Sequence, residues 1–196
     1  MSALRVLGAS DYRRMRWLNG GGWTTEIARE PADPAQAFQW RVSIADVEAD
    51  GPFSMVPGVS RDLVLLEGAG VELEFPGGRR ERLTRRFQHL QFDGADNVQC
   101  RLVDGPTRDF NVMTRDGFAR ATVLARPLVD SMVLFREPGA GWLVHVHAGS
   151  ATCEGEGGQW PLGAGATLRA DAAAMPERLV VRGGGELVLV KLAIVG

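Results

Sequence analysis

The stretch LVLLEGAGVELEFPGG, residues 63–78, is echoed by LVHVHAGSATCEGEGG, residues 143–158. The two stretches lie 80 positions apart and share five of sixteen residues. Each contains a short apolar strand, a turn of small residues, a second strand and a Gly-Gly turn. The tripeptide RLV at 101–103 also recurs at 178–180, a similar shift. Self-similarity at a nearly fixed shift predicts two copies of one β module.

Turn residues divide the rest of the chain in the same way. Ten prolines and 25 glycines separate segments that alternate or stay apolar for four to eight residues, which is typical of an all-β protein. Two such modules with Gly-rich returns, as at 161–166, predict a double cupin (bicupin), in which two jelly-roll-like β-barrel modules are fused. We expect the N-terminal module at residues 1–120 and the C-terminal module at 121–196, packed as one compact unit. One short helix is expected at 10–15, where Ser10 can serve as the cap.

The composition narrows the classes of partner. Lys and Arg number 22 against 24 Asp and Glu, and the short arginine clusters lack interleaved aromatic residues, so no nucleic acid partner is expected. No apolar window approaches the length of a membrane span, so we expect no membrane partner and a cytoplasmic location. Cys100 and Cys153 match no zinc spacing and are expected to be buried thiols.

His145 and His147 could place two imidazole groups on one strand face, and such a pair can bind a metal. However, the alternating residues Trp142, Val144 and Val146 form the continuous apolar face, so the histidines are expected to point away from the core. No acid follows His147 before residue 154, and no third histidine follows at all. A metal site normally needs three or four protein ligands. We therefore predict no metal site and no cofactor.

Polar side chains alternate with apolar ones in three segments. Arg41 and Ser43 share one face of the expected strand 40–44, Asp109 and Asn111 share one face of 109–113, and Thr24 and Glu26 share one face after the glycines. On an outer sheet surface these residues form a solvated polar face. In a barrel mouth the same residues form a ligand pocket, in which arginine takes a carboxylate and the acids hold the arginine.

The glycine triplet at 20–22 follows Asn19 and leads into a strand-like run. Glycine permits positive φ and leaves amide groups uncovered, so the segment is either a tight corner or a cradle of amides for an anion. A phosphate-binding P-loop is excluded because no Lys-Ser/Thr and helix follow the glycines.

Four segments, in this order, resemble the HutD/Ves family: WLNGGGWTTEIA at 17–28, FQWRVSIADVEADGPFSMVPGVSR at 38–61, LVLLEGAG at 63–70 and DGPTRDFNVMTR at 104–115. The resemblance implies a bicupin from a histidine-utilisation gene context, without an established catalytic reaction. Together with the alternation, it implies ligand-binding positions in the first module. These are Asn19, Gly21, Thr24, Glu26, Arg41, Ser43, Arg61, Asp109 and Asn111.

The expected function is binding of a small carboxylated metabolite of histidine breakdown, urocanate or an N-substituted glutamate, which modulates histidine utilisation. The alternative is a metal-independent isomerase or hydrolase that uses Glu26 or Asp109 as a general base. A third interpretation is a scaffold for another protein, with a barrel that holds no ligand. The sequence leaves a homodimer open.

Overall fold

Strands make up nearly all of the regular structure, and the all-β prediction is confirmed. The computed structural model describes residues 4–195. Their elements are β1 (Arg5–Leu7), β2 (Arg13–Arg16), β3 (Gly22–Glu30), β4 (Trp40–Val47), β5 (Gly51–Pro52), β6 (Val59–Glu67), β7 (Val71–Glu74), the 3-10 turn η1 (Pro76–Gly78), β8 (Arg80–Leu83), β9 (His89–Asp93), β10 (Gln99–Leu102), β11 (Thr107–Arg115), β12 (Ala119–Phe135), β13 (Ala140–Gly155), β14 (Gly158–Gly163), β15 (Thr167–Ala170) and β16 (Arg178–Ile194). Within this part of the chain, no helix has the length and apolar character needed to cross a membrane.

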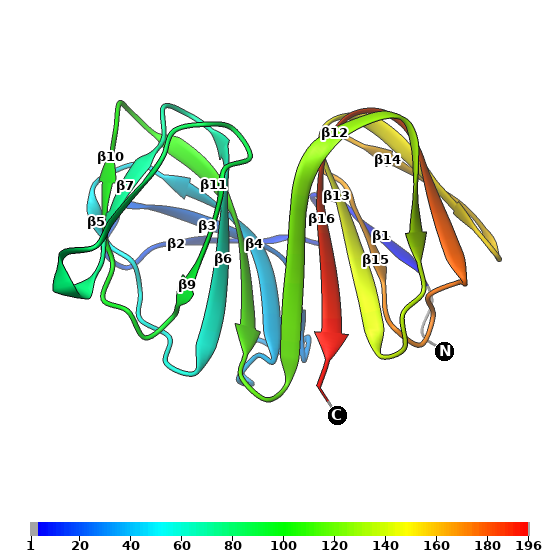
Figure 1. Ribbon diagram of the computed structural model, residues 1–196, viewed down its shortest axis with the longest axis horizontal. Coiled ribbons are helices and arrows are strands. Elements are labelled where there is room, and N and C mark those ends of the chain that lie inside the picture. Colours follow the sequence, from blue (N-terminus) through cyan, green and yellow to red (C-terminus); the bar gives the residue numbers. More distant parts are fainter. Residues whose placement is uncertain (1–3, 196) are drawn as a thin grey trace. The chain divides into compact units, whose positions relative to one another are not determined.

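The chain divides into two compact units, and Figure 1 shows both with most of their strands labelled. The first unit, Arg13–Phe118, contains the sheet β2-β3-β4-β11-β6-β9 and the sheet β5-β10-β7-β8. The second unit contains the residues from 4 to 12 and those from 119 to 195, with the strand order β1-β15-β13-β16-β12 and β14 paired to β13.

The N-terminal strand β1 differs from expectation because it belongs to the second unit. We expected residues 1–120 to form the first module, but β1 pairs with β15, with Leu7 opposite Thr167. This ladder satisfies the backbone of β1, and the Tyr12 hydroxyl adds hydrogen bonds to the Gly165 carbonyl and to Thr167 Oγ1, both at 2.8 Å.

The helix expected at 10–15 is wrong. Residues 9–11 form a turn, in which the Gly8 amide donates to Asp11 Oδ2 at 2.9 Å. Arg13–Arg16 then extend as β2 and pair with β3. The side chain of Asp11 satisfies the turn and the ladder satisfies the strand, so the local capping signal is overridden by tertiary pairing.

The two units repeat the same strand pairing. β6 pairs with β11 and β9, just as the first half of β13 pairs with β16 and β15. β7 pairs with β10 and β8, just as the second half of β13 pairs with β16 and β14. The predicted repetition of strands 63–66 and 143–146 is therefore found at equivalent places in the pairing.

The inward-facing residues of these repeats are offset by one position. Leu63 and Leu65 pack in the core of the first unit, whereas Val144 and Val146, not Leu143, pack in the core of the second. Each unit has a register shift just after these residues, between Leu65 and Glu67 against β11 and between Val146 and Ala148 against β16, so the offset already exists before this point. Because a one-residue slip turns every side chain of a strand to the other face, the shift of 80 aligns the strands but not their faces.

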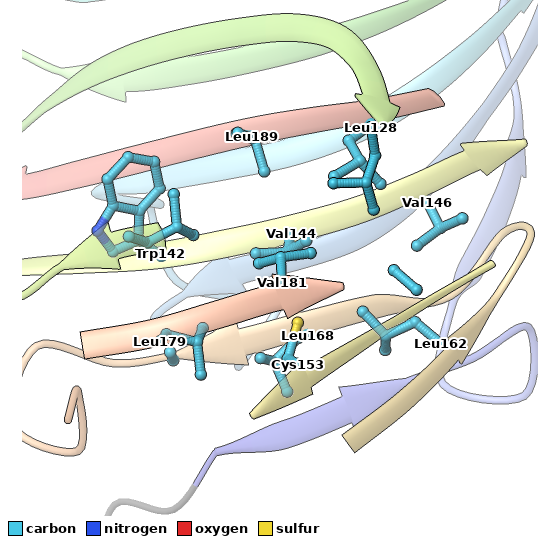
Figure 2. Close-up of a cluster of buried hydrophobic side chains, with 14 of the residues drawn as sticks. Leu128, Trp142, Val144, Val146, Cys153, Leu162, Leu168, Leu179, Val181 and Leu189 are labelled. Atoms are coloured by element: carbon cyan, nitrogen blue, oxygen red, sulfur yellow. The ribbon is translucent and has the colours of Figure 1, made fainter. Parts of the chain in front are cut away.

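The second core is a continuous apolar cluster, shown in Figure 2, that includes Trp142, Val144, Leu168, Leu187 and Leu189. The first core contains Leu63, Leu65, Leu73 and three phenylalanines. Cys100 lies in the first core and Cys153 in the second, and both are buried free thiols, which confirms the expectation.

Three glycines allow β16 to bend between its two pairing regions. Gly185 has φ of 140°, and a Cβ there would lie 2.0 Å from the Ala148 carbonyl oxygen. Gly184, its neighbour, has no atom within 4 Å of an added Cβ. Only the glycines that face the opposite backbone are therefore irreplaceable.

We expect Gly185→Ala to lower the free energy of unfolding by about 1–3 kcal/mol or more, since it combines a strained φ with a backbone clash. Gly184→Ala is the matched control and should change stability by less than about 1 kcal/mol. Urea unfolding of both variants measures the difference, and equal stability of the two would contradict this account of the bend.

Candidate functional site

The polar faces predicted from alternation lie inside the first unit, on the strands β3, β4 and β11, and the adjacent strand β6 adds Arg61. Arg41, Met113 and Arg61 are direct cross-strand partners and form one row. The next row places Ser43 opposite Asn111, and the third places Ala45 opposite Asp109. Side chains in adjacent rows on one face lie close together, so the strand register gathers these polar groups.

These rows line a cavity of about 440 Å³. Its wall is formed by Met15, Arg16, Trp17, Leu18, Asn19, Thr24, Arg41, Ser43, Ala45, Pro52, Phe53, Ser54, Arg61, Asp109, Asn111 and Met113. Seven of the nine predicted site residues are among them, and the other two are Gly21 and Glu26. These polar side chains therefore do not lie on a solvated outer face of the sheet.

Glu26 orients Arg41 from beside the cavity. Arg41 Nε donates to Glu26 Oε2 at 2.7 Å, and the side chain of Arg41 retains 21% of its exposure. Among residues 4–195, no hydrogen bond is made by the two terminal nitrogens of Arg41. The guanidinium is therefore held by one edge and leaves the other edge available for a ligand with two acceptor oxygens.

Arg61 is buried at the inner end of the cavity, with 6% relative exposure. Its Nη2 donates to Asn111 Oδ1 and its Nη1 to the Ser54 carbonyl, both at 3.3 Å. The guanidinium also stacks near the rings of Phe53 and Phe92, at 5.2 and 5.0 Å. Burial lowers the pKa of Arg61 to about 10, opposed by the charge of Asp109, so the group is still cationic at neutral pH.

Asp109 balances this cation indirectly. Its Oδ1 accepts a hydrogen bond from Asn111 Nδ2, whose own carbonyl accepts from Arg61. Oδ2 of Asp109 and Nε of Arg61 are buried and have no hydrogen-bond partner among the described residues. Burial raises the pKa of Asp109 to about 7, against the lowering effects of Arg61 and of the Asn111 hydrogen bond.

The glycine triplet is a tight corner. Gly20 has φ of 73°, and its amide donates to the Trp17 carbonyl at 3.0 Å. The Gly21 amide donates to Asn19 Oδ1 at 3.0 Å, and a Cβ on Gly22 would lie 2.2 Å from the Asp46 carbonyl oxygen. Two of the three amides are therefore used within the corner. The alternative of an open amide cradle is disfavoured, and Gly21 acts through the backbone shape.

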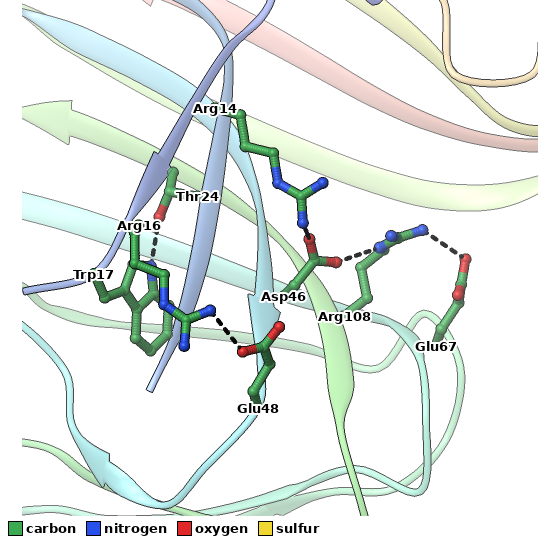
Figure 3. A network of polar contacts seen from close by, with 8 residues as sticks. All are labelled: Arg14, Arg16, Trp17, Thr24, Asp46, Glu48, Glu67 and Arg108. Carbon is green, nitrogen blue, oxygen red and sulfur yellow. Dashed lines mark hydrogen bonds and ion pairs between the residues drawn. The ribbon is translucent and has the colours of Figure 1, made fainter. Parts of the chain in front are cut away.

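The corner places Trp17 and Asn19 on the cavity wall, and Figure 3 shows the contacts that fix this rim. Trp17 Nε1 donates to Thr24 Oγ1 at 2.8 Å, so the predicted residue Thr24 holds the indole in place. Arg16 pairs with Glu48 at 2.9 Å. The rim arginine therefore already has its own carboxylate.

The second unit lacks the polar trio Arg61, Asp109 and Asn111, because apolar residues occupy the three matching positions. In the first unit the pairs are Arg61–Met113, Leu63–Asn111 and Leu65–Asp109. In the second, they are Trp142–Lys191, Val144–Leu189 and Val146–Leu187. Trp142, Leu187 and Leu189 thus replace Arg61, Asp109 and Asn111, and all three pack in the apolar cluster.

His145 lies on the strand face opposite Val144 and Val146, as predicted, but it is buried. Its Nδ1 is 2.9 Å from Thr167 Oγ1, and burial, followed by the effect of His147, lowers its pKa to about 3. In the described part of the chain, no three His, Cys, Asp or Glu residues are grouped as metal ligands.

Sequence reasoning missed the apolar walls of the cavity. Trp17, Phe53 and Met113 line it, and Phe92 stacks on Arg61. Met113 continues the alternation of Asp109 and Asn111 and could have been found by that signal. Phe92 could not, because its approach to Arg61 depends on the pairing of β6 with β9.

Two sets of antiparallel strands around an interior cavity define a protein of the cupin type. The cupin 2 conserved barrel domain protein from Leptotrichia buccalis shares this fold, with 12% identity, 87% of this chain and 88% of that chain covered, and a TM-score of 0.54. The chain belongs to the HutD family, whose model matches residues 9–189.

Three relatives illustrate the membership. An uncharacterized 21.2 kDa protein in the hutC 3' region of Pseudomonas putida is 42% identical over 113 residues, which is 58% of this chain and 59% of that protein. Protein Ves from Cronobacter sakazakii is 42% identical over 108 residues, which is 55% of this chain and 58% of that protein. The chain thus spans about three fifths of the length of these curated relatives. HutD from Pseudomonas fluorescens SBW25 (formate condition) is 33% identical, covers 99% of this chain and 100% of its own, and has a TM-score of 0.84.

The raised pKa of Asp109 gives a prediction for stability. Because the folded-state pKa is about 7 and the ordinary value is 3.8, the folded chain binds more protons than the unfolded chain between these values. The contribution of Asp109 protonation to the free energy of unfolding is complete below about pH 4 and is lost as the pH rises through 7. Asp109→Asn does not lose stability in this way, because asparagine has no proton to release. The stability of the variant relative to the parent should therefore rise by roughly 2–4 kcal/mol from pH 4 to pH 8, at about 1.4 kcal/mol per pKa unit.

Urea unfolding at both pH values measures this difference. Asp104→Asn, at an exposed loop position of the same unit, is the control and should show no such pH dependence. A relative stability of Asp109→Asn that stays flat with pH would refute the raised pKa.

Proposed function

We propose that the cavity of the first unit binds a small carboxylated molecule through Arg41 and Arg61. The observation that carries this proposal is the state of Arg41, which is held at Nε by Glu26 and keeps both terminal nitrogens free of hydrogen bonds to residues 4–195. A planar guanidinium in this state matches a carboxylate with two parallel hydrogen bonds.

The arrangement around the two arginines supports a small ligand. Arg41 and Arg61 extend from strands separated by β11 alone, so their backbones are about 10 Å apart. Ser43 and Asn111 lie in the next row and can orient polar groups of the ligand. Trp17, Phe53 and Met113 provide apolar walls for its carbon skeleton.

The biological ligand in this proposal is an intermediate of histidine breakdown, urocanate or an N-substituted glutamate, and its binding modulates histidine utilisation. Support comes from the printed names of relatives, one in a hutC 3' region and one called HutD. Both ligand candidates carry the carboxylate that the arginines are suited to bind. A cytoplasmic location belongs to the same proposal.

The alternative function is a metal-independent isomerase or hydrolase, and one observation favours it. A carboxyl with a pKa of about 7 is suited to general acid–base chemistry at neutral pH, and Asp109 lines the cavity. Turnover of histidine-pathway intermediates by the purified protein would support this alternative, whereas binding without turnover supports the first proposal.

Arginine-to-lysine exchanges test the anchor. Thermal-shift screening against pathway intermediates first identifies a ligand, since a ligand at a hundred times its Kd adds about 2.7 kcal/mol to folded-state stability. Arg41→Lys should then weaken carboxylate binding by roughly 1.5–3 kcal/mol, because lysine cannot make the two-pronged contact. If Arg61 is the main anchor, Arg61→Lys should show this loss of affinity and Arg41→Lys should bind nearly as the parent does.

Arg101→Lys, at an exposed position of the same unit, is the matched control and should bind as the parent does. Isothermal calorimetry measures the affinities of all four proteins. Parental affinity in both Arg41→Lys and Arg61→Lys would remove the cavity from consideration as the carboxylate site.

A further inference from the structure

We propose that the cavity takes up one proton with its ligand, at Asp109, and is selective for ligands that carry a single negative charge. This inference rests on the proposed carboxylate site and adds its charge selectivity and its response to pH. It follows from the charges that surround the cavity and from the hydrogen-bonded chain Arg61–Asn111–Asp109.

The charges around the cavity balance in pairs before any ligand enters. Glu26 compensates Arg41 at 2.7 Å, and Glu48 compensates Arg16 at the rim at 2.9 Å. Arg61 has no carboxylate within ion-pair distance among the described residues, and its nearest charge balance is Asp109, reached through Asn111. With Asp109 ionised, the cavity is therefore neutral.

An anion that enters beside Arg61 competes with Asp109 for the same positive charge. The two negative charges then lie in an enclosed, poorly solvated space, where their repulsion is large. Protonation of Asp109 removes this repulsion and leaves Arg61 for the ligand. By linkage, whatever raises the proton affinity of Asp109 on binding also makes binding stronger when the proton is present.

Asp109 has a place for the proton. Its Oδ1 already accepts from Asn111, whereas Oδ2 is buried and has no partner among residues 4–195. A proton on Oδ2 leaves the Asn111 hydrogen bond in place, so Asn111 continues to orient Arg61. Burial has already brought the pKa of Asp109 to about 7, so the proton is available near neutral pH.

The other charged groups near Asp109 do not replace it in this role. Arg61 stays cationic, and Arg41 is paired with Glu26. Asp46 is engaged by Arg14 and Arg108 on the other face of β4 (Figure 3). Burial raises the pKa of Cys100, which faces Asp109 from β10, to about 12, so this thiol stays neutral. None of the three histidines lines the cavity. Asp109 is thus the group that titrates.

The charge limit follows directly. With Asp109 protonated, the cavity carries one net positive charge, which matches one carboxylate. A second carboxylate would have to lose its hydration without a free cation, which is costly in an enclosed site. A monocarboxylate should therefore bind better than a dicarboxylate of the same size. Of the two candidates proposed above, this favours urocanate, which has one carboxylate, over an N-substituted glutamate, which has two.

Crotonate and fumarate form a matched pair of probes, because both are planar four-carbon acids and fumarate has a carboxylate in place of the methyl group. Calorimetric titration at pH 8 in Tris and in triethanolamine, two buffers with different ionisation enthalpies, counts the protons taken up. We expect crotonate to bind with uptake approaching one proton and with affinity falling roughly tenfold per pH unit above 7. Fumarate should bind at least tenfold more weakly.

Asp109→Asn should bind crotonate with no proton uptake and with the same affinity at pH 7 and pH 8.5, whereas Asp104→Asn should behave as the parent does. Crotonate binding without proton uptake, or fumarate binding as tight as crotonate binding, overturns this inference and leaves the proposed carboxylate site intact. Failure of the parent to bind either acid from pH 6 to 8 counts against the proposed function itself. If Asp109→Asn does not fold, the buffer pair and the pH profile of the parent decide the result.

Discussion

Because side chains alternate along a strand, the register of β11 between β4 and β6 decides where every polar group of the site lies. It places Arg41 and Arg61 on either side of Met113, and Asn111 opposite Ser43. A slip of one residue would turn Asp109 and Asn111 out of the cavity and bring Phe110 and Val112, now fully buried on the other face, into it. The cavity therefore exists only in this register. The apolar residues of both faces enforce it, since any slip would expose them or bury charges among them.

The two units show how one architecture supports either a binding cavity or a filled core. The strand pairing is the same, but Arg61, Asp109 and Asn111 are matched by Trp142, Leu187 and Leu189. Trp142, Leu187 and Leu189 pack in the apolar core of the second unit, where Figure 2 labels Trp142 and Leu189. The polar residues of the first unit cannot pack in this way, because a buried charge needs a partner. The result is a cavity at one end of the first barrel, with Leu63 and Leu65 packed beneath it.

Electrostatic balance gives the cavity its chemical character. Arg41 is held close to Glu26 by a direct ion pair, whereas Arg61 reaches Asp109 only through the Asn111 amide. The direct pair fixes the direction of one guanidinium. The indirect pair leaves a carboxyl whose pKa is near neutrality and which responds to any anion that approaches. The same burial that raises the pKa of Asp109 strengthens the field that a ligand experiences, so ligand binding and protonation share one physical cause.

Local patterns in the amino-acid sequence predicted the all-β class, the two repeated modules, the two buried thiols and most of the polar positions on the cavity wall. They could do so because the alternation of polar and apolar residues and the turn residues are local signals that persist in the fold. The motifs of the HutD family added Arg61, which alternation alone does not single out. The pairing of distant strands sets three further features: the polar face of Arg41 and Ser43 points inward, β1 joins the second unit, and residues 13–16 form a strand rather than a helix. The same pairing sets the one-residue offset between the inward-facing positions of the two repeats, and it brings Phe92 against Arg61. These features depend on which strands pair and in which register, and pairing between distant segments leaves no local signal in the chain.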